Sequence, residues 1–399
     1  MIDKELIVSL LTKTIEMRYL FILFFLLNSC LLYAQNEMLL PDEIKNKFKF
    51  IEIKAHFGAF LKSNGNLKAN GLLDNGYGSV NFKIGWQPTH PTSWASRYNY
   101  PAYGFGFYSG FLSDARVFGN PNAVFGFIRF PLSPPESRNT FSIEPALGLT
   151  YKLNPYNSET NPLNDAIGAR MAVYFNLNFG FTYKWTREVD LLYGFDFTHL
   201  SNGSTYKPNS GLNLYGFNVG LRYNYNVNQI KQNIDIYSNA MLPARFKRPY
   251  SSPMNTTKYK FLSVYLAGGL GQTDEMIGSS TLMGVFSGII DLEYKFNEMH
   301  GINMGIDMMY DNRLRDLVAS QRWMPALHTG YTFSFYKFDI KIQLGTYLGK
   351  QNGKGDFFMR PALRYHLTDK VFAQVGLKTL DGGKADYIEY GFGFRPFSW

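Results

Sequence analysis

His199 and Ser201 are the residues in this sequence whose types and spacing best fit a chemical role. They lie two positions apart in the run Phe197-Thr-His-Leu-Ser-Asn202. On a β-strand, residues two apart point to the same side, so the imidazole and the hydroxyl would be neighbours. An imidazole in that place can take the hydroxyl proton, which makes serine a nucleophile near neutral pH. The spacing alone is a weak signal, because His-x-Ser is a common sequence.

The flanking residues predict a β-hairpin that places this pair at the end of a strand. Residues 190–202 and 211–225 alternate between apolar and polar side chains, and a polar loop at 203–210 separates them. The odd-numbered face of the first segment is apolar until its last two members: Leu191, Tyr193, Phe195, Phe197, His199 and Ser201. Two polar side chains at the end of an otherwise apolar face suggest a function.

Two asparagines complete the predicted site. If the hairpin is symmetric about residues 206–207, Ser201 pairs with Asn213 across the two strands, on the face that also carries His199. Asn213 would then be close enough to touch the pair. Asn202, or backbone N–H groups beside it, could stabilise an oxyanion.

The composition favours a membrane β-barrel. Aromatic residues make up 17% of the 399 residues, Gly occurs 37 times, and only 18% of the residues are charged, whereas about a quarter are charged in soluble domains. This balance suits a barrel with an apolar outer face and a polar lumen. The net charge of +9 would favour an anionic surface such as lipopolysaccharide, and charges spread over loops and lumen explain it equally well.

Strand-like segments continue through most of the chain. From about residue 47 onward, about 14 to 16 segments have the length and alternation of strands, and the clearest covers 169–185. Its length fits a tilted strand that crosses a membrane, and only helices or closed sheets satisfy their backbone groups in lipid. We therefore expect an all-β fold, a transmembrane antiparallel β-barrel of about 14 strands (12–16), over residues 35–399.

The connections between these segments orient the predicted barrel. Short turns lie near residues 186, 298, 336 and 368, and longer loops lie near 153–168, 203–210, 311–320 and 348–355. Long loops are typical of the external side, so His199 and Ser201 are expected near the external end of their strand. Residues 227–256 do not fit this alternation and are interpreted as a long connection or plug. Several charged residues have interior parity: Arg170, Asp196, Arg222, Asp291, Glu293 and Asp307.

The N-terminus predicts export. Residues 17–34 have the basic, apolar and small-residue pattern of a secretory signal peptide cut after Ala34, and residues 1–16 are interpreted as an upstream extension. The alternatives are a lipoprotein signal that uses Cys30 and a retained anchor helix, although the apolar run is shorter than the ~20 residues of a span. Cys30 is the only cysteine, so the mature chain would have no disulfide and no thiol nucleophile.

The sequence predicts assembly partners but no cofactor. The last alternating segment, 385–395, and the terminal Trp399 resemble the assembly signal of bacterial outer-membrane barrels, although Pro396 interrupts it. We therefore expect the barrel-assembly machinery as a partner. The histidines outside the candidate site show no metal-ligand spacing: His56, His90, His300, His328 and His366. No metal, cofactor or nucleic acid is expected.

The run Phe197–Asn202, followed by Pro208-Asn-Ser-Gly-Leu-Asn213, resembles the signature of the lipid A deacylase family of the PagL type. The resemblance is tight over about 190–225 and looser over about 45–226. It implies an eight-stranded outer-membrane esterase that removes an ester-linked acyl chain from lipid A, with lipopolysaccharide and membrane lipids as partners. His199 would be the general base, Ser201 the nucleophile and Asn202 an oxyanion contributor. Residues 227–399 would be additional strands, in a larger barrel or a fused half.

Asn213 departs from the family pattern, in which a glutamate orients the histidine. An amide can accept a hydrogen bond from His199, but it does not stabilise the imidazolium as a carboxylate does. The change from carboxylate to amide in a serine protease lowers kcat by about four orders of magnitude. Asp196 has the parity of the lumen and points away. We expect a serine-type lipid A deacylase or related acyl-ester hydrolase. The alternative is a non-catalytic outer-membrane barrel: a channel, a structural protein or an inactive lipid-binding relative.

Overall fold

A computed structural model describes residues 47–61, 66–89, 93–134, 137–186, 188–226, 259–314, 316–349, 354–381 and 383–399. The predicted signal peptide, His90 and the connection at 227–256 lie outside these residues. The described helices are short, and none of them is long and apolar enough to cross a membrane. They are α3 (Asn66–Ala69), α4 (Ala115–Phe118), η1 (Trp94–Tyr98), η3 (Asp274–Met276), η4 (Asn312–Leu314) and η5 (Ala319–Arg322).

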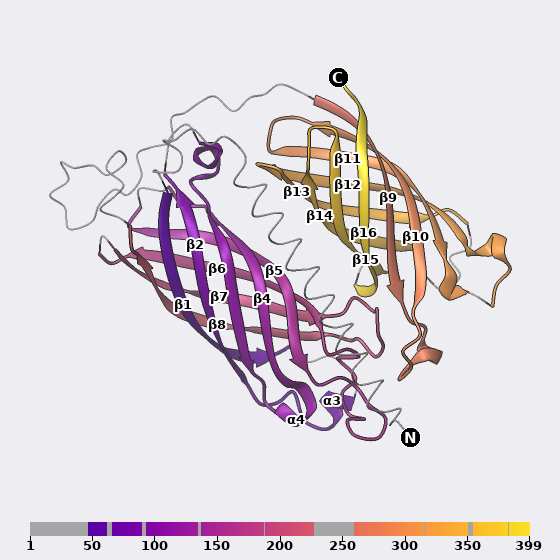
Figure 1. Cartoon of the computed structure of the whole chain (residues 1–399), viewed down its shortest axis with the longest axis horizontal. Helices are drawn as coiled ribbons and strands as arrows, with labels where there is room; N and C mark the ends of the chain where they lie inside the picture. The colour runs from indigo at the N-terminus through magenta and orange to yellow at the C-terminus, as the bar shows by residue number, and fades with distance from the viewer. Residues whose placement is uncertain are drawn as a thin grey trace, which may run out of the picture. The chain divides into compact units, whose positions relative to one another are not determined.

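The first eight strands form one closed antiparallel barrel, drawn from indigo to magenta in Figure 1. They are β1 (Lys47–Phe60), β2 (Tyr77–Pro88), β3 (Ala102–Phe111), β4 (Gly119–Pro131), β5 (Asn139–Leu153), β6 (Ala172–Lys184), β7 (Val189–Ser201) and β8 (Leu212–Asn224). Each strand pairs with the next, and β8 pairs back with β1 over a register that runs from Phe50↔Asn224 to Phe60↔Leu214. The sheet therefore closes before residue 227.

The next eight strands form a second closed barrel, drawn from orange to yellow in Figure 1. They are β9 (Tyr259–Gly271), β10 (Met283–Lys295), β11 (His300–Asp311), β12 (Trp323–Phe335), β13 (Phe338–Tyr347), β14 (Phe357–His366), β15 (Val371–Leu380) and β16 (Lys384–Ser398). β16 closes the sheet on β9, and Pro396 lies in a register shift between Phe394 and Phe397, after which the pairing resumes. Pro396 therefore bends the last strand without ending it.

The all-β antiparallel barrel class is confirmed, and the described strands number 16, at the upper end of the expected range. The prediction of a single barrel of about 14 strands is corrected, because the strands divide into two barrels of eight. Alternation along a strand reports which face a side chain takes. It does not report which distant strand closes the sheet, so alternation alone does not distinguish one larger barrel from two smaller ones.

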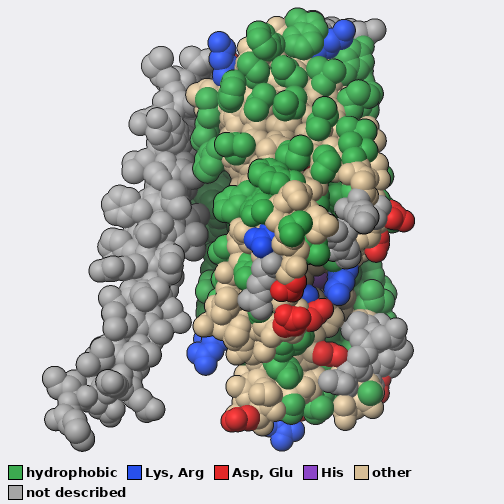
Figure 2. Space-filling model, turned by 90° about the vertical axis from the view of Figure 1, so that its right-hand side faces the viewer, with side chains coloured by type: hydrophobic (Ala, Val, Ile, Leu, Met, Phe, Trp, Pro, Cys, Tyr) green, Lys and Arg blue, Asp and Glu red, His purple; other side chains and the backbone are tan. Residues whose placement is uncertain are grey.

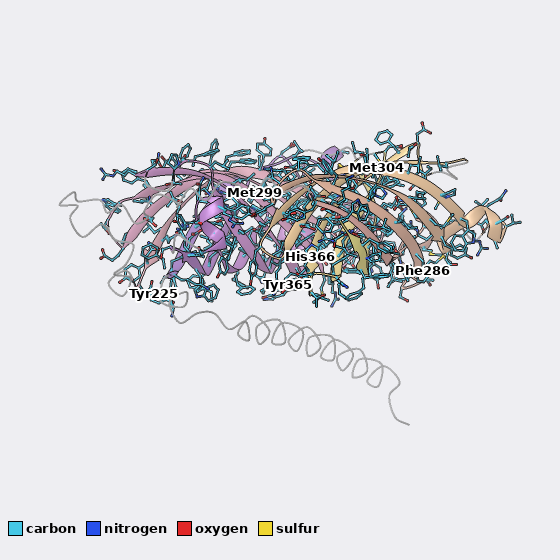
Figure 3. The ribbon with its side chains drawn as sticks, turned by 90° about the horizontal axis from the view of Figure 1, so that it is seen from above. Tyr225, Phe286, Met299, Met304, Tyr365 and His366 are labelled. Carbon is cyan, nitrogen blue, oxygen red and sulfur yellow. The ribbon has the colours of Figure 1, made fainter. Side chains whose placement is uncertain are left out.

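The apolar and polar residues that alternate along the strands also alternate between exposed and buried positions. On β7, Tyr193 and Phe195 are 37% and 39% exposed, whereas Asp196 and Thr198 are buried. The second barrel has the same pattern, with Phe286 and Met304 among the exposed side chains of its outer wall (Figure 3). Figure 2 shows a face on which hydrophobic side chains form a broad surface and acidic side chains lie in the lower half. Outer walls of this kind fit a lipid surrounding.

The interiors are filled with paired charges. In the first barrel, Glu52 and Glu144 lie among four cations: Lys54, Lys83, Arg129 and Arg222. In the second barrel, His328 Nδ1 lies 2.5 Å from Asp307 and its Nε2 lies 3.3 Å from Asp291. An eight-stranded barrel is just wide enough to be filled by side chains. The interior parity is thus confirmed except for Arg170, which is exposed in the connection before β6.

The buried side chain of Asn164 links several connections by hydrogen bonds, at the end of the first barrel where Ser201 lies. Asn164 Nδ2 donates to the carbonyl oxygens of Val117 and Asn154, at 3.0 and 2.7 Å. Its Oδ1 accepts from the N–H groups of Ala166 and Ile167, both at 3.2 Å. Two carbonyl oxygens next to these amides bind the hairpin loop. The carbonyl oxygen of Ala166 accepts from the N–H of Gly211, and that of Asp165 accepts from the N–H and the hydroxyl group of Ser210.

Replacing Asn164 by alanine removes four hydrogen bonds at once, and each buried group left unsatisfied costs about 1–3 kcal/mol. The strands do not use this side chain, so we expect the barrel to stay folded while the connections 154–171 and 202–211 open locally. Hydrogen exchange followed by mass spectrometry should show faster exchange in both connections and unchanged exchange in the strands.

Asn157→Ala is the matched control, because Asn157 is exposed in the same connection and bonds only within its own turn, to the N–H groups of Glu159 and Thr160. Equal exchange in the two variants would contradict the assigned role of Asn164.

Candidate active site

The register of the hairpin brings His199 and Asn213 directly opposite each other. The prediction paired Ser201 with Asn213 instead, and it is wrong by two residues along the strand. The observed pairs are centred on Tyr206. Asn209 folds back onto the end of β7, where its Oδ1 accepts the N–H of Asn202 at 3.0 Å. The shift moves Asn213 to the residue that it would have to orient.

His199 Nδ1 lies 2.7 Å from Oδ1 of Asn213. An amide oxygen only accepts hydrogen bonds, so Nδ1 carries the proton and donates it. The proton-free nitrogen is then Nε2, which is the atom that a general base needs. Asn213 therefore fixes the useful tautomer of His199 and its ring orientation, although it brings no negative charge.

Ser201 Oγ is held by the loop that follows it. Asn209 Nδ2 donates to the hydroxyl oxygen at 2.9 Å, and the N–H of Gly203 donates to it at 3.1 Å. The hydroxyl also lies 3.2 Å from Asn209 Oδ1. Asn209 lies within the family motif, but the sequence predicts no role for it. An amide in an irregular loop follows no periodic pattern, so only the contact itself reveals it.

Asn202 is adjacent to Ser201, and two of its three N–H groups donate to other residues. Its backbone N–H donates to Asn209, and its Nδ2 donates to the carbonyl oxygen of Tyr206 at 2.9 Å. Its Oδ1 is buried and has no hydrogen-bond partner among the described residues. The predicted oxyanion role of Asn202 would therefore fall to the second N–H of its Nδ2.

Gly211 lies beneath the pair and requires the absence of a side chain. Its φ is +74°, in the left-handed region, and a Cβ built on it would lie 2.9 Å from His199 Cε1 and 3.5 Å from Ser201 Cβ. His199 and Ser201 thus converge over the same backbone position, as their two-residue spacing on one strand face predicts. A side chain here would push against the imidazole directly.

The nearby carboxylate of Asp196 is turned away from this site. Asp196 is buried in the lumen, where it accepts from Asn176 at 2.8 Å and lies 3.1 Å from His56 Nδ1. It does not replace the missing glutamate. Over the described part of the chain, no three His, Cys, Asp or Glu side chains are grouped so that they could hold a metal ion. The structure brings His199, Ser201 and Asn213 together at one end of the hairpin.

Solved structures similar to this chain are other β-barrels of low identity. Neisserial surface protein A is 12% identical, covers 45% of this chain and 97% of its own, and gives a TM-score of 0.29. The N-terminal β-barrel domain of Pseudomonas aeruginosa OprF is 11% identical, covers 44% and 97%, and gives 0.25. Acinetobacter baumannii Omp33 is 6% identical, covers 88% and 98%, and gives 0.17. Such likenesses carry no information on function. No curated protein matches the chain.

Two protein families match adjacent parts of the sequence. Residues 80–222 match lipid A 3-O-deacylase (PagL), and residues 260–399 match the acyloxyacyl hydrolase C-terminal domain that bears the same family name. The first match covers most of the first barrel and includes the whole candidate site. The second match begins at β9 and runs to the last residue. The chain therefore belongs to the lipid A deacylase family of the PagL type and is an outer-membrane protein of Gram-negative bacteria.

Proposed function

We propose that this protein is a serine-type acyl-ester hydrolase that removes an acyl chain from lipid A. The observation that carries the proposal is the hydrogen bond between His199 Nδ1–H and Asn213 Oδ1 on the face that also presents Ser201. It leaves Nε2 of the imidazole free to act as base beside a serine hydroxyl. Membership of a deacylase family supplies the substrate class.

In this mechanism Ser201 Oγ attacks the ester carbonyl carbon while His199 Nε2 takes the hydroxyl proton. The carbonyl oxygen becomes an oxyanion, which Asn202 and Nδ2 of Asn209 would stabilise. Collapse of the tetrahedral intermediate breaks the ester bond, and the imidazolium gives its proton to the departing sugar oxygen. A water molecule, deprotonated by His199, then cleaves the acyl-enzyme and releases the fatty acid.

The outer wall beside the site suits an acyl chain. Phe195 and Tyr215 are 39% and 40% exposed on the same face as His199, and Phe217 is 63% exposed further along β8. A hydrocarbon chain in the membrane can lie along these rings with its ester at the strand end. Lipid A provides such chains in the outer leaflet. Recognition by the barrel-assembly machinery remains a prediction from the aromatic final strand.

Asn213 favours a second candidate, an inactive lipid-binding relative. Without a carboxylate, the imidazolium formed during attack is stabilised less, and the site has the geometry of a triad without its charge. A channel is less well supported, because paired side chains fill both described barrel interiors. Lipid A analysis and substitution of Asn213 distinguish an active enzyme from an inactive relative.

Cells with acyloxyacylated lipid A that express the full chain should lose one ester-linked acyl mass from lipid A, as measured by mass spectrometry. Ser201→Ala should abolish the loss, because it removes the attacking oxygen. Ser137→Ala, at the opposite end of the first barrel, is the control and should behave like the wild type. Unchanged lipid A with the wild-type chain, and no hydrolysis of simple esters, would rule out the enzyme.

Asn213→Glu should raise kcat for ester hydrolysis by at least about tenfold, because a carboxylate stabilises the imidazolium as well as the tautomer; the corresponding loss in a serine protease is about 10⁴-fold. Asn213→Gln has the size of the glutamate without its charge and should give no increase. If glutamate and glutamine have the same effect, charge at residue 213 does not limit the reaction. If only Asn213→Glu is active, the natural chain is the inactive relative.

A further inference from the structure

A polar cavity lies at the end of the first barrel opposite Ser201. It is lined from the ends of seven strands that meet there, and its lining residues include Gln87, Arg129, Thr140, Lys184, Asp190 and Arg222. Ser201 ends β7, whereas Asp190 begins it, so the length of the strand separates the two places. This cavity takes no part in the proposed ester hydrolysis.

Two buried arginines in this lining each keep an N–H group without a partner. Arg129 is 4% exposed. Its Nη2 donates to the two carboxylate oxygens of Glu52, at 2.9 and 3.0 Å, while its Nη1 has no hydrogen-bond partner among the described residues. Arg222 is 3% exposed and uses Nε on Glu52 and Nη1 on Gln87, while its Nη2 is unpartnered there. Leaving a buried guanidinium donor unsatisfied is costly, so both nitrogens would gain from a hydrogen-bond acceptor.

The charge around the cavity has the sign that attracts an anion. Its lining holds three basic side chains, Arg129, Lys184 and Arg222, against one carboxylate, Asp190. Behind them lie two further carboxylates and two lysines, Glu52, Glu144, Lys54 and Lys83. The lining has two more positive than negative side chains, and the four charges behind it cancel. The cavity region therefore has an excess of two positive charges. In a confined, partly desolvated place such an excess is a strong local field.

The lining also includes neutral polar side chains. Thr182 is one of them, whereas the hydroxyl groups of Thr140 and Ser142 donate to the carbonyl oxygens of Ser137 and Gly180, and Gln87 lies between Arg222 and the carbonyl oxygen of Tyr100. Planar guanidinium groups with hydroxyl neighbours are the usual surroundings of a tetrahedral oxyanion. The ring of Phe50 stacks 4.3 Å from the Arg222 guanidinium and limits its movement.

We propose that this cavity is a binding site for a small oxyanion of the phosphate class, held by Arg129 and Arg222. The anion accepts from Nη1 of Arg129 and Nη2 of Arg222, and Lys184 adds long-range attraction. The site is independent of the ester hydrolysis, and it lies at the barrel end remote from Ser201. The phosphate group belongs either to free inorganic phosphate or to a soluble phospholipid headgroup.

The test is titration of the full chain, in detergent micelles at constant ionic strength, with inorganic phosphate and separately with glycerophosphoethanolamine. Calorimetry or ³¹P NMR should show saturable binding of one anion per chain for at least one of the two. Arg222→Gln should weaken that binding at least tenfold, and Ser201→Ala should leave it unchanged. The stronger of the two ligands identifies the source of the phosphate group.

Arg138→Gln is the matched control, because Arg138 is exposed at the same barrel end and stacks on Tyr183, outside the cavity lining. It should bind phosphate like the wild type. Arg129→Gln removes a partner of two buried carboxylates, so if it fails to fold, Gln87→Ala replaces it and should also weaken binding. No saturable binding by the wild type, or equal losses in Arg222→Gln and Arg138→Gln, would show that only water fills the cavity.

Discussion

The requirement that every backbone N–H and C=O be paired within lipid determines this structure. Each sheet meets it by closing: β8 pairs with β1, and β16 pairs with β9. Closure fixes which face of every strand is outside, and so it fixes the alternation of exposed rings and buried charges. Charges that lipid would not tolerate lie in the lumen, where cations surround the carboxylates. The candidate site is an exception, since it places polar side chains on an outer wall at the edge of the apolar band.

That exception depends on neutral hydrogen bonds. Asn213 orients His199, and Asn209 holds Ser201, so the site next to the membrane surface carries amides where a carboxylate would bring a charge. A neutral amide is easier to desolvate than a carboxylate. Asn213 therefore orients His199 at a lower desolvation cost than a carboxylate would, but it brings no negative charge. Asn164 sets the loop positions on which this geometry rests.

Much of the fold follows from the sequence, because a period of two is a local property. The opposite directions of Phe195 and Asp196, and the hairpin that bears His199, follow from alternation alone. Closure of the first sheet does not, since the pairing of Phe50 with Asn224 joins residues far apart in the chain. The register of Asn213 depends on how an irregular loop folds back. Whether the protein is exported through a signal peptide remains a prediction.

Two complete sheets in one chain also have a consequence for biogenesis. Because all the strands of the first barrel precede residue 227, that barrel has no open edge once its own eight strands are in the membrane. The second half can still be unfolded at that moment without exposing a strand of the first to unwanted pairing. A single sixteen-stranded sheet would have to stay open until its last strand arrived. The sixteen described strands can thus form two small barrels that close separately.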